Sequence, residues 1–292
     1  MRILIIANPL VGILKDKKAV VEEITSRITR QGGTVDITYI INPGMGQKHS
    51  SRAALEGYDA VYAAGGDGTI NDVASGLIGR SISMGIIPLG TGNGCARGLG
   101  IPLYRDDFID VLLNKKITAI DVGKIGSRIF LSTAGIGYDA NIAHDFNQLE
   151  TSRRNMQKFF FLAVKNYFLK CSENVKLIFD GKEMNRTVFG LTICNTPQYG
   201  GGAIIAPQAS PSSGKLIAVL IPKFTLFKAP LAIYKLFNGS LTEYKDLEYI
   251  SFNTLKIIRP QEDLVQVDGE SFKGDKILTV SVEPLALNII TP

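Results

Sequence analysis

Short apolar runs and amphipathic stretches alternate along the first part of the chain. The apolar runs have the length of buried strands, and they occupy residues 3–7, 35–41, 60–64 and 83–88. Residues 17–30 lie between two of these runs and carry apolar side chains at helical spacing, namely Val20, Val21, Ile24 and Ile28. This rhythm of strand and helix predicts an α/β domain with a parallel sheet and helices on its faces.

The pattern changes near residue 120, where strands follow one another without helices of this kind between them. Glycine turns predict two hairpins, one joining 120–125 to 128–132 and one joining 175–179 to 187–194. Further strands are expected at 216–221, 255–258, 265–267 and 277–282. We therefore expect a first α/β domain over residues 1–119 and a mostly antiparallel, β-rich second domain over residues 120–283.

Two segments of the second half combine basic and aromatic residues. The first is a helical stretch within 141–170, in which Arg153, Arg154 and Lys158 precede three phenylalanines at 159–161, and the second is 223–234. A basic, aromatic helix is able to lie on a membrane surface. Packing of the phenylalanines against the second sheet is the simpler interpretation, and it is the one expected here.

Glycine clusters follow two of the predicted strands. Gly65-Gly66-Asp67-Gly68-Thr69 follows strand 60–64, and Gly90-Thr91-Gly92-Asn93-Gly94 follows strand 83–88. The N–H groups of a helix start favour an anion such as phosphate, and Asp67 would repel that anion unless a divalent cation lay between them. A tight turn capped by Asp67 and Thr69 explains the first cluster equally well. Two such turns at one edge of a parallel sheet favour a ligand site.

These two motifs, in this order and spacing, resemble the nucleotide site of the diacylglycerol kinase catalytic domain, a family that includes bacterial soluble lipid kinases and the sphingosine and ceramide kinases. The resemblance implies a diacylglycerol kinase-like fold, related to that of the NAD kinases, with ATP and Mg²⁺ bound in the first domain. It also implies a lipid-substrate role for the second domain and a return of the final segment, 284–292, to the first. The nucleotide-binding residues it implies are Asn8, Pro9, Gly12, Gly65, Gly66, Asp67, Gly68, Thr69, Asn71, Thr91 and Asn93, with Asp67 next to the metal.

An Asp-Gly-Glu sequence, Asp268-Gly269-Glu270, follows the predicted strand 265–267. Alone it is an ordinary β-turn. The family resemblance implies that one of its acids accepts the proton of the substrate hydroxyl, and we expect Glu270 in this role, with Asp268 as the alternative. Bacterial relatives carry acids that hold a structural magnesium in the loop that here reads Ser210 to Leu216. Serine and lysine do not replace carboxylates as magnesium ligands, so we expect that ion to be absent, with the Lys215 ammonium supplying charge.

Composition limits the remaining choices. Hydrophobic residues make up 45% and charged residues 20% of the chain, which is typical of a globular protein. The net charge of +5 is not gathered into a basic patch, so no nucleic acid partner is expected. Three cysteines at no metal-ligand spacing indicate reduced thiols in the cytoplasm. No apolar run approaches the ~18 residues of a membrane span.

We therefore expect a cytoplasmic, ATP-dependent lipid kinase that works peripherally at the inner membrane surface and transfers the γ-phosphoryl group to a hydroxyl, most simply that of a diacylglycerol-like lipid. A homodimer is left open. One alternative is a catalytically inactive lipid-binding or regulatory protein of the same fold, since the chain departs from the family pattern at Val11, Gly94, Ser213 and Lys215. The other is a kinase of a soluble acceptor such as NAD, which shares the Gly-Gly-Asp-Gly turn.

Overall fold

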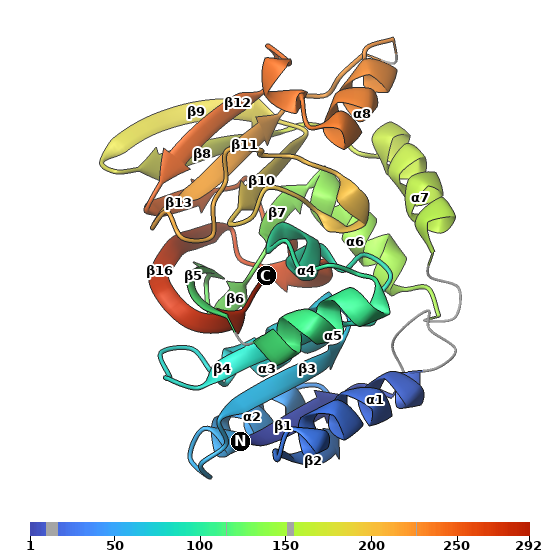
Figure 1. Ribbon diagram of the computed structural model, residues 1–292. Coiled ribbons are helices and arrows are strands. Elements are labelled where there is room, and N and C mark those ends of the chain that lie inside the picture. The colour runs from blue at the N-terminus through green and yellow to red at the C-terminus, as the bar shows by residue number, and fades with distance from the viewer. Residues whose placement is uncertain (10–16, 115, 151–154, 226) are drawn as a thin grey trace. The chain divides into compact units, whose positions relative to one another are not determined.

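The chain divides into two compact units. The computed structural model describes residues 1–9, 17–114, 116–150, 155–225 and 227–292. The first unit is Met1–Ile120 together with Leu285–Pro292, and the second is Asp121–Pro284 (Figure 1). These bounds differ by one residue from those expected from the sequence.

The first unit alternates strands and helices. Its elements are β1 (Arg2–Ala7), α1 (Lys17–Arg30), β2 (Thr34–Tyr39), α2 (Met45–Ala53), β3 (Ala60–Gly65), α3 (Asp67–Ser75), β4 (Ser83–Pro88), α4 (Gly94–Gly98) and α5 (Arg105–Asn114). The strands lie in the order β2-β1-β3-β4, and each pair is parallel. Asn288 and Ile289, near the end of the last strand of the chain, pair with β4 in the same direction.

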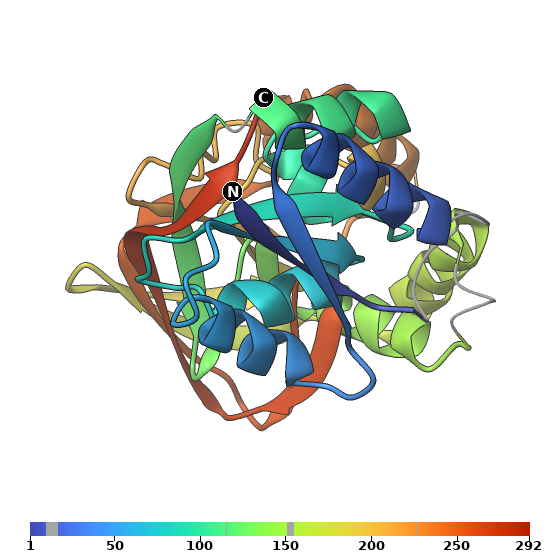
Figure 2. The same ribbon diagram turned by 60° about the horizontal axis from the view of Figure 1, so that its bottom comes forward.

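Helices cover both faces of this parallel sheet. Helices α1 and α5 lie on one face, and α2 and α3 lie on the other (Figure 2). Every residue of β3 and β4 is buried. Burial on both faces explains why these strands are apolar along their whole length, without alternating with polar residues. The parallel α/β prediction is confirmed.

The second unit is built from antiparallel strands and three α-helices in the described part of the chain. Its elements are β5 (Ile117–Ile125, which begins in the first unit), β6 (Arg128–Phe130), β7 (Thr133–Gly137), α6 (Tyr138–Asn147), α7 (Met156–Leu169), β8 (Glu173–Phe179), β9 (Lys182–Val188), β10 (Gly190–Cys194), β11 (Leu216–Ile221), α8 (Ala229–Asn238), β12 (Glu248–Phe252), β13 (Thr254–Ile258), β14 (Asp263–Val267), β15 (Glu270–Gly274) and β16 (Ile277–Ile290, whose end belongs to the first unit).

Two sheets form a sandwich in the second unit. One sheet has the order β12-β11-β10-β7-β14-β15, with every pair antiparallel. The other contains β16, β13, β8 and β9 in that order, again antiparallel. Apolar side chains from both sheets form one buried cluster, in which Leu177 of β8 and Leu255 of β13 join Ile136 of β7 and Val265 of β14. The predicted β-rich second domain is therefore confirmed.

One predicted hairpin is wrong in its second strand. Strand β8 turns at Asp180-Gly181 and pairs with β9, Lys182–Val188, with Phe179 opposite Lys182. The apolar segment expected in that position was 187–194; most of it, Gly190–Cys194, is instead β10 and pairs with β7 and β11 in the other sheet. The prediction failed because β9 is largely exposed and polar, so hydrophobic patterning did not mark it as a strand.

The expected packing of the phenylalanines at 159–161 is also wrong. All three side chains, together with Phe168, are exposed on α7. Arg153 and Arg154, which precede this helix, lie outside the described residues.

Candidate nucleotide site and acidic hairpin

The turns that follow β1, β3 and β4 meet in the first unit. Asn8 donates a hydrogen bond from its backbone N to Ala64 O (3.0 Å) and from Nδ2 to Thr69 Oγ1 (3.3 Å). Leu89 N donates to Gly65 O (2.9 Å). The carboxyl ends of these parallel strands thus bring both glycine clusters to one edge of the sheet, as the sequence predicted.

The two glycine turns approach each other at Gly66 and Gly90. A Cβ on Gly90 would lie 2.6 Å from the Gly66 Cα and 2.9 Å from Asn93 Oδ1. Asn93 Oδ1 accepts a hydrogen bond from Gly90 N (2.8 Å), and its own backbone is left-handed, with φ of 47°. Gly90 is therefore required for the contact of one turn with the other, a packing reason that exists without any ligand.

Asp67 connects the first glycine turn to the second. Its Oδ2 accepts a hydrogen bond from Gly94 N (3.0 Å), and its Oδ1 accepts one from Cys95 N (2.9 Å). Burial raises the pKa of the Asp67 carboxyl, and the N–H groups of Cys95 and Gly94 oppose that rise. The carboxylate thus holds the start of α4, a role that the sequence interpretation of Asp67 as a cap of its own helix did not include.

The other residues of the predicted nucleotide site lie around these turns. Gly65 packs so closely on Thr69 that a Cβ would lie 2.5 Å from Thr69 Oγ1. Gly68 lies in the first turn of α3, Asn71 lies further along that helix, and Thr91 lies in the turn after β4; all three are partly buried. Pro9 follows Asn8 in the turn after β1. Gly12 and Val11 lie outside the described residues.

Asp72, which is not among the predicted site residues, supports this edge. It accepts hydrogen bonds from Gly46 N (2.7 Å) and Gln47 N (3.3 Å) at the start of α2. A Cβ on Gly46 would lie 2.6 Å from Asp72 Oδ2. Gly46 and Asp72 are distant in sequence, so no local pattern identified the pair.

In the second unit, Asp268 and Gly269 form the turn between β14 and β15. Both have positive φ, 47° and 85°, which defines the two-residue type I′ hairpin turn. The β-turn interpretation of this sequence is correct for the backbone. Asp268 is nevertheless buried, and its carboxylate accepts hydrogen bonds from three backbone N–H groups, those of Leu131 (2.8 Å), Ser132 (2.8 Å) and Thr133 (3.1 Å).

The two acids of the hairpin have opposite environments. Glu270 begins β15 and is exposed, whereas Asp268 is enclosed by backbone donors. Helix α6 supports the turn, since Asn147 Nδ2 donates to Gly269 O (3.0 Å). His144 of the same helix lies with Nδ1 3.4 Å from Ser271 Oγ. The His144 side chain is half-buried against the hairpin.

A buried polar cluster surrounds Asp139 at the start of α6. Its carboxylate accepts hydrogen bonds from Thr192 Oγ1 and from the Tyr199 hydroxyl (2.6 Å to the latter). Burial raises the pKa of Asp139 and, together with the Asp139 charge, raises that of Tyr199. Asp139 and Tyr199 are distant in sequence, so no local pattern predicted this contact.

The loop that departs from the family pattern closes on a buried carboxylate. Gly214 N donates to Asp121 Oδ2 (2.6 Å), and Asp121 is fully buried. Ser213 Oγ lies within hydrogen-bond distance of the carbonyl oxygens of Ser210 (2.9 Å) and Lys215 (3.1 Å), either of which is able to accept its one proton. In the described part of the chain, no group of three or more His, Cys, Asp or Glu side chains is arranged to hold a metal ion. The role of Lys215 stays a prediction.

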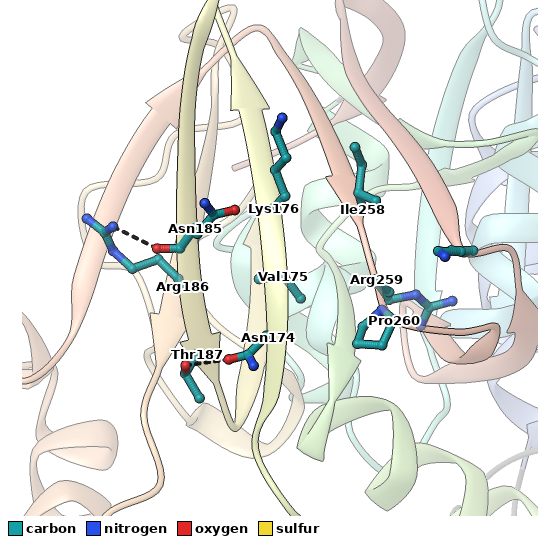
Figure 3. A pocket seen from close by; sticks show the side chains of 10 residues that line it. Asn174, Val175, Lys176, Asn185, Arg186, Thr187, Ile258, Arg259 and Pro260 are labelled. Carbon is teal, nitrogen blue, oxygen red and sulfur yellow. Dashed lines mark hydrogen bonds between the residues drawn. The ribbon is translucent and has the colours of Figure 1, made fainter.

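A hollow of about 460 Å³ lies elsewhere in the second unit, over β8, β9 and the segment after β13 (Figure 3). None of the predicted site residues lines it. Its two arginines are already engaged: buried Arg259 donates to carbonyls that include Gly274 O (2.8 Å), and Arg186 pairs with Glu248 (2.7 Å). We assign no ligand to this hollow.

Fold and site together define a class: a parallel α/β unit with two joined glycine turns, followed by an antiparallel sandwich that carries an Asp-Gly-Glu hairpin. Models of two protein families match the chain. The diacylglycerol kinase catalytic domain matches residues 2–125, and the YegS C-terminal NAD kinase beta sandwich-like domain matches residues 132–291. Together these two models cover most of the chain, which therefore belongs to the diacylglycerol kinase family with a YegS-type C-terminal domain.

Similar proteins agree with this assignment. A diacylglycerol kinase of Bacillus subtilis is 28% identical over 235 residues, covering 76% of this chain and 74% of the relative. A diacylglycerol kinase of Mycobacterium tuberculosis is 28% identical over 301 residues, covering 98% of this chain and 94% of the relative. The crystal structure of a diacylglycerol kinase from Bacillus anthracis superimposes with a TM-score of 0.73 at 18% identity, covering 100% of this chain and 97% of that one. At that identity the last comparison supports the fold alone.

Among the described helices, none is both long and apolar enough to cross a membrane.

Proposed function

We propose that this protein is an ATP-dependent kinase that transfers the γ-phosphoryl group to the hydroxyl of a diacylglycerol-like lipid. The observation that carries the proposal is the junction of the two glycine turns through Asp67, in a chain of the lipid kinase family. Phosphoryl transfer depends on positioned phosphates more than on covalent chemistry by the protein. Closely packed glycine turns beside the start of α3 suit that task.

The residues of the first unit fit a nucleotide that brings its own magnesium. Mg²⁺ is commonly held by one or two carboxylates together with substrate phosphates and water, and it supplies positive charge against the developing negative charge. Asp67 is the acid of the glycine turns, and each of its oxygens already accepts one backbone hydrogen bond. A carboxylate oxygen has a second lone pair available, so contact with a cation is compatible with these bonds. We assign Asp67 both roles.

Glu270 is the residue that we assign as proton acceptor. Three N–H donors stabilise the charged form of Asp268 and so weaken it as a base. Glu270, two residues away, is exposed and able to meet an acceptor hydroxyl. Asp268 then acts as a positioning residue that fixes the turn from which Glu270 projects.

A lipid acceptor is supported by the family and by relatives named as diacylglycerol kinases. The test is transfer of labelled phosphate from ATP, with magnesium, to a panel of acceptors in detergent micelles: diacylglycerol, phosphatidylglycerol, sphingosine, ceramide and, as a soluble acceptor, NAD. We expect label in diacylglycerol. Label in NAD alone would replace the lipid by a soluble acceptor. Retained ATP binding with no labelled product would indicate a regulatory protein of the same fold.

Variants test the assignment of the base. Glu270→Gln is expected to bind ATP as the unaltered protein does and to lose roughly 10²–10⁴-fold in transfer rate, the usual contribution of a general base. Glu183→Gln changes an exposed glutamate of β9 and serves as the control, with full activity expected. Full activity of Glu270→Gln would remove Glu270 from the reaction.

A further inference from the structure

Helix α7 presents its apolar side to solvent. Phe161, Val164 and Phe168 follow one another at i, i+3 and i+7, and they form an outward stripe in which Phe161 is 65% and Phe168 is 63% exposed. The inward side of the helix carries Leu162 but also Asn166, which is buried and donates to Asp145 Oδ2 (3.0 Å). A surface helix of a soluble domain normally has the opposite arrangement.

Helix α8 continues the same surface. Ile233, Tyr234 and Phe237 are exposed along it, and the described residue it buries is the small Ala232. Phe237 stacks on Phe160 of α7, with ring centroids 5.9 Å apart, and Figure 1 draws the two helices next to each other within the second unit. We call the exposed apolar residues of the two helices the α7–α8 surface. Its members are Phe159, Phe160, Phe161, Val164, Phe168, Leu169, Leu231, Ile233, Tyr234 and Phe237.

The charged residues of the two helices and of the residues next to them are all basic. Residues 155–170 and 222–238 include six lysines and no aspartate or glutamate. Lys158 and Lys223 are exposed. Acids from other segments pair with four of the lysines: Lys165 contacts Asp145, Lys170 contacts Asp263, Lys228 contacts Asp246, and Lys235 contacts Glu243. No acidic side chain belongs to the helices themselves.

Exposed apolar side chains together with lysines favour one binding partner of the α7–α8 surface over another. A second copy of the chain, packed symmetrically, would bring the same lysine-bearing surface against itself, and like charges would oppose the contact. An anionic bilayer accepts the phenylalanines into its acyl boundary while its headgroups attract the lysines. Exposed aromatics flanked by lysines are the composition expected of a helix that lies in the membrane interface.

We propose that the α7–α8 surface docks the protein on an anionic lipid bilayer, with the outward stripes of the two helices inserted below the headgroups. The choice of a bilayer as partner rests on the proposed lipid kinase function, because a long-chain acceptor resides in a membrane. The docking surface itself belongs to the second unit and involves neither Asp67 nor Glu270.

The experiment measures partition onto sucrose-loaded vesicles without nucleotide. Vesicles of phosphatidylglycerol and phosphatidylcholine are compared with vesicles of phosphatidylcholine alone. Phe161→Ser combined with Phe168→Ser is expected to lower partition by roughly tenfold or more on the anionic vesicles, because two exposed apolar anchors are removed. Lys158→Glu is expected to lower binding to anionic vesicles and to leave the weak binding to phosphatidylcholine unchanged.

Two control variants carry substitutions of the same kinds outside the α7–α8 surface. Leu55→Ser removes an apolar side chain that is 77% exposed in the first unit, and Lys256→Glu reverses an exposed lysine of β13. Both are expected to bind vesicles like the unaltered protein. Equal binding by the double phenylalanine variant and the unaltered protein would overturn the proposal. A dimer in solution that only the double variant converts to monomer would also overturn it, by showing that a second copy covers the surface.

A second readout separates docking from catalysis. All variants are assayed with a short-chain, water-soluble diacylglycerol, and the double phenylalanine variant is expected to keep its activity on this acceptor. If the unaltered protein is active as a kinase but the variants bind vesicles as well as it does, the docking surface is refuted and the kinase function is not. Surface-dependent vesicle binding without transfer to any lipid would support the docking surface and refute the kinase function.

Discussion

Asp268 offers a direct test of how the acidic hairpin is built, because the chain contains a second Asp-Gly turn of the same geometry. Asp180-Gly181 joins β8 to β9 with φ of 47° and 77°, close to the 47° and 85° of Asp268-Gly269. Asp180 is exposed, whereas Asp268 is buried against three N–H donors. Asparagine tolerates this left-handed backbone, so Asp→Asn at either position changes the side-chain interactions and little else.

The expected cost follows from the hydrogen bonds. At Asp268, Oδ1 accepts from Ser132 and Thr133, and Oδ2 accepts from Leu131. In the best placement of an asparagine, its side-chain oxygen takes the place of Asp268 Oδ1 and keeps the bonds from Ser132 and Thr133. Its NH₂ group then takes the place of Oδ2 and faces the Leu131 N–H. One donor is then buried without a partner, which costs about 1–3 kcal/mol, and the other two bonds lose the negative charge that strengthens them. Asp268→Asn is therefore expected to lower the free energy of unfolding by about 2–4 kcal/mol, whereas Asp180→Asn is expected to lower it by less than about 0.5 kcal/mol.

Thermal unfolding followed by circular dichroism measures this difference. A loss of about 3 kcal/mol lowers Tm by roughly 6–12 °C in a domain of this size. Asp268→Asn is therefore expected to unfold clearly below both the unaltered protein and Asp180→Asn. Equal Tm values for the two variants would refute the structural role of Asp268. A normal Tm combined with lost transfer would move the proton acceptor from Glu270 to Asp268.

Three further changes test other contacts. Asp67→Ala is expected to lower stability by about 1–3 kcal/mol, measured by urea unfolding, because the Gly94 and Cys95 N–H groups lose their acceptor; unchanged stability would refute the bridging role. Gly90→Ala places a Cβ 2.6 Å from the Gly66 Cα, and a loss of about 1–3 kcal/mol with weaker ATP binding is expected in calorimetry. Burial raises the pKa of Asp139, so the native state keeps a proton that the unfolded chain releases above about pH 4, and stability falls as pH rises toward the folded pKa. Asp139→Asn cannot ionise, and urea midpoints measured from about pH 5 to about pH 9 should fall less for this variant than for the unaltered protein; parallel curves would contradict this.

The local pattern of apolar residues was sufficient to predict strands that are buried on both faces. Strands β3 and β4 are buried on both faces, so a continuous apolar run marked them, and the glycines that end them marked the turns. Strand β9 was missed because most of its residues are exposed to solvent, where composition is weakly constrained. Its place was wrongly given to 187–194, since an apolar segment fits either sheet of a sandwich equally well.

From the amino-acid sequence it follows that two glycine turns end neighbouring strands of a parallel sheet and that an Asp-Gly-Glu turn follows antiparallel strands. What the acids contact depends on the folded chain, because their partners are distant in sequence: Asp67 accepts hydrogen bonds from N–H groups at the second turn, and Asp268 accepts them from those of residues 131–133. The environment of the α7 phenylalanines also depends on the folded chain, because phenylalanine is equally suited to a protein core and to a surface that contacts a membrane. Hydrophobic spacing specifies which residues share a helix face, but the direction of that face depends on what else packs against the helix, here the inward Asn166 and Leu162.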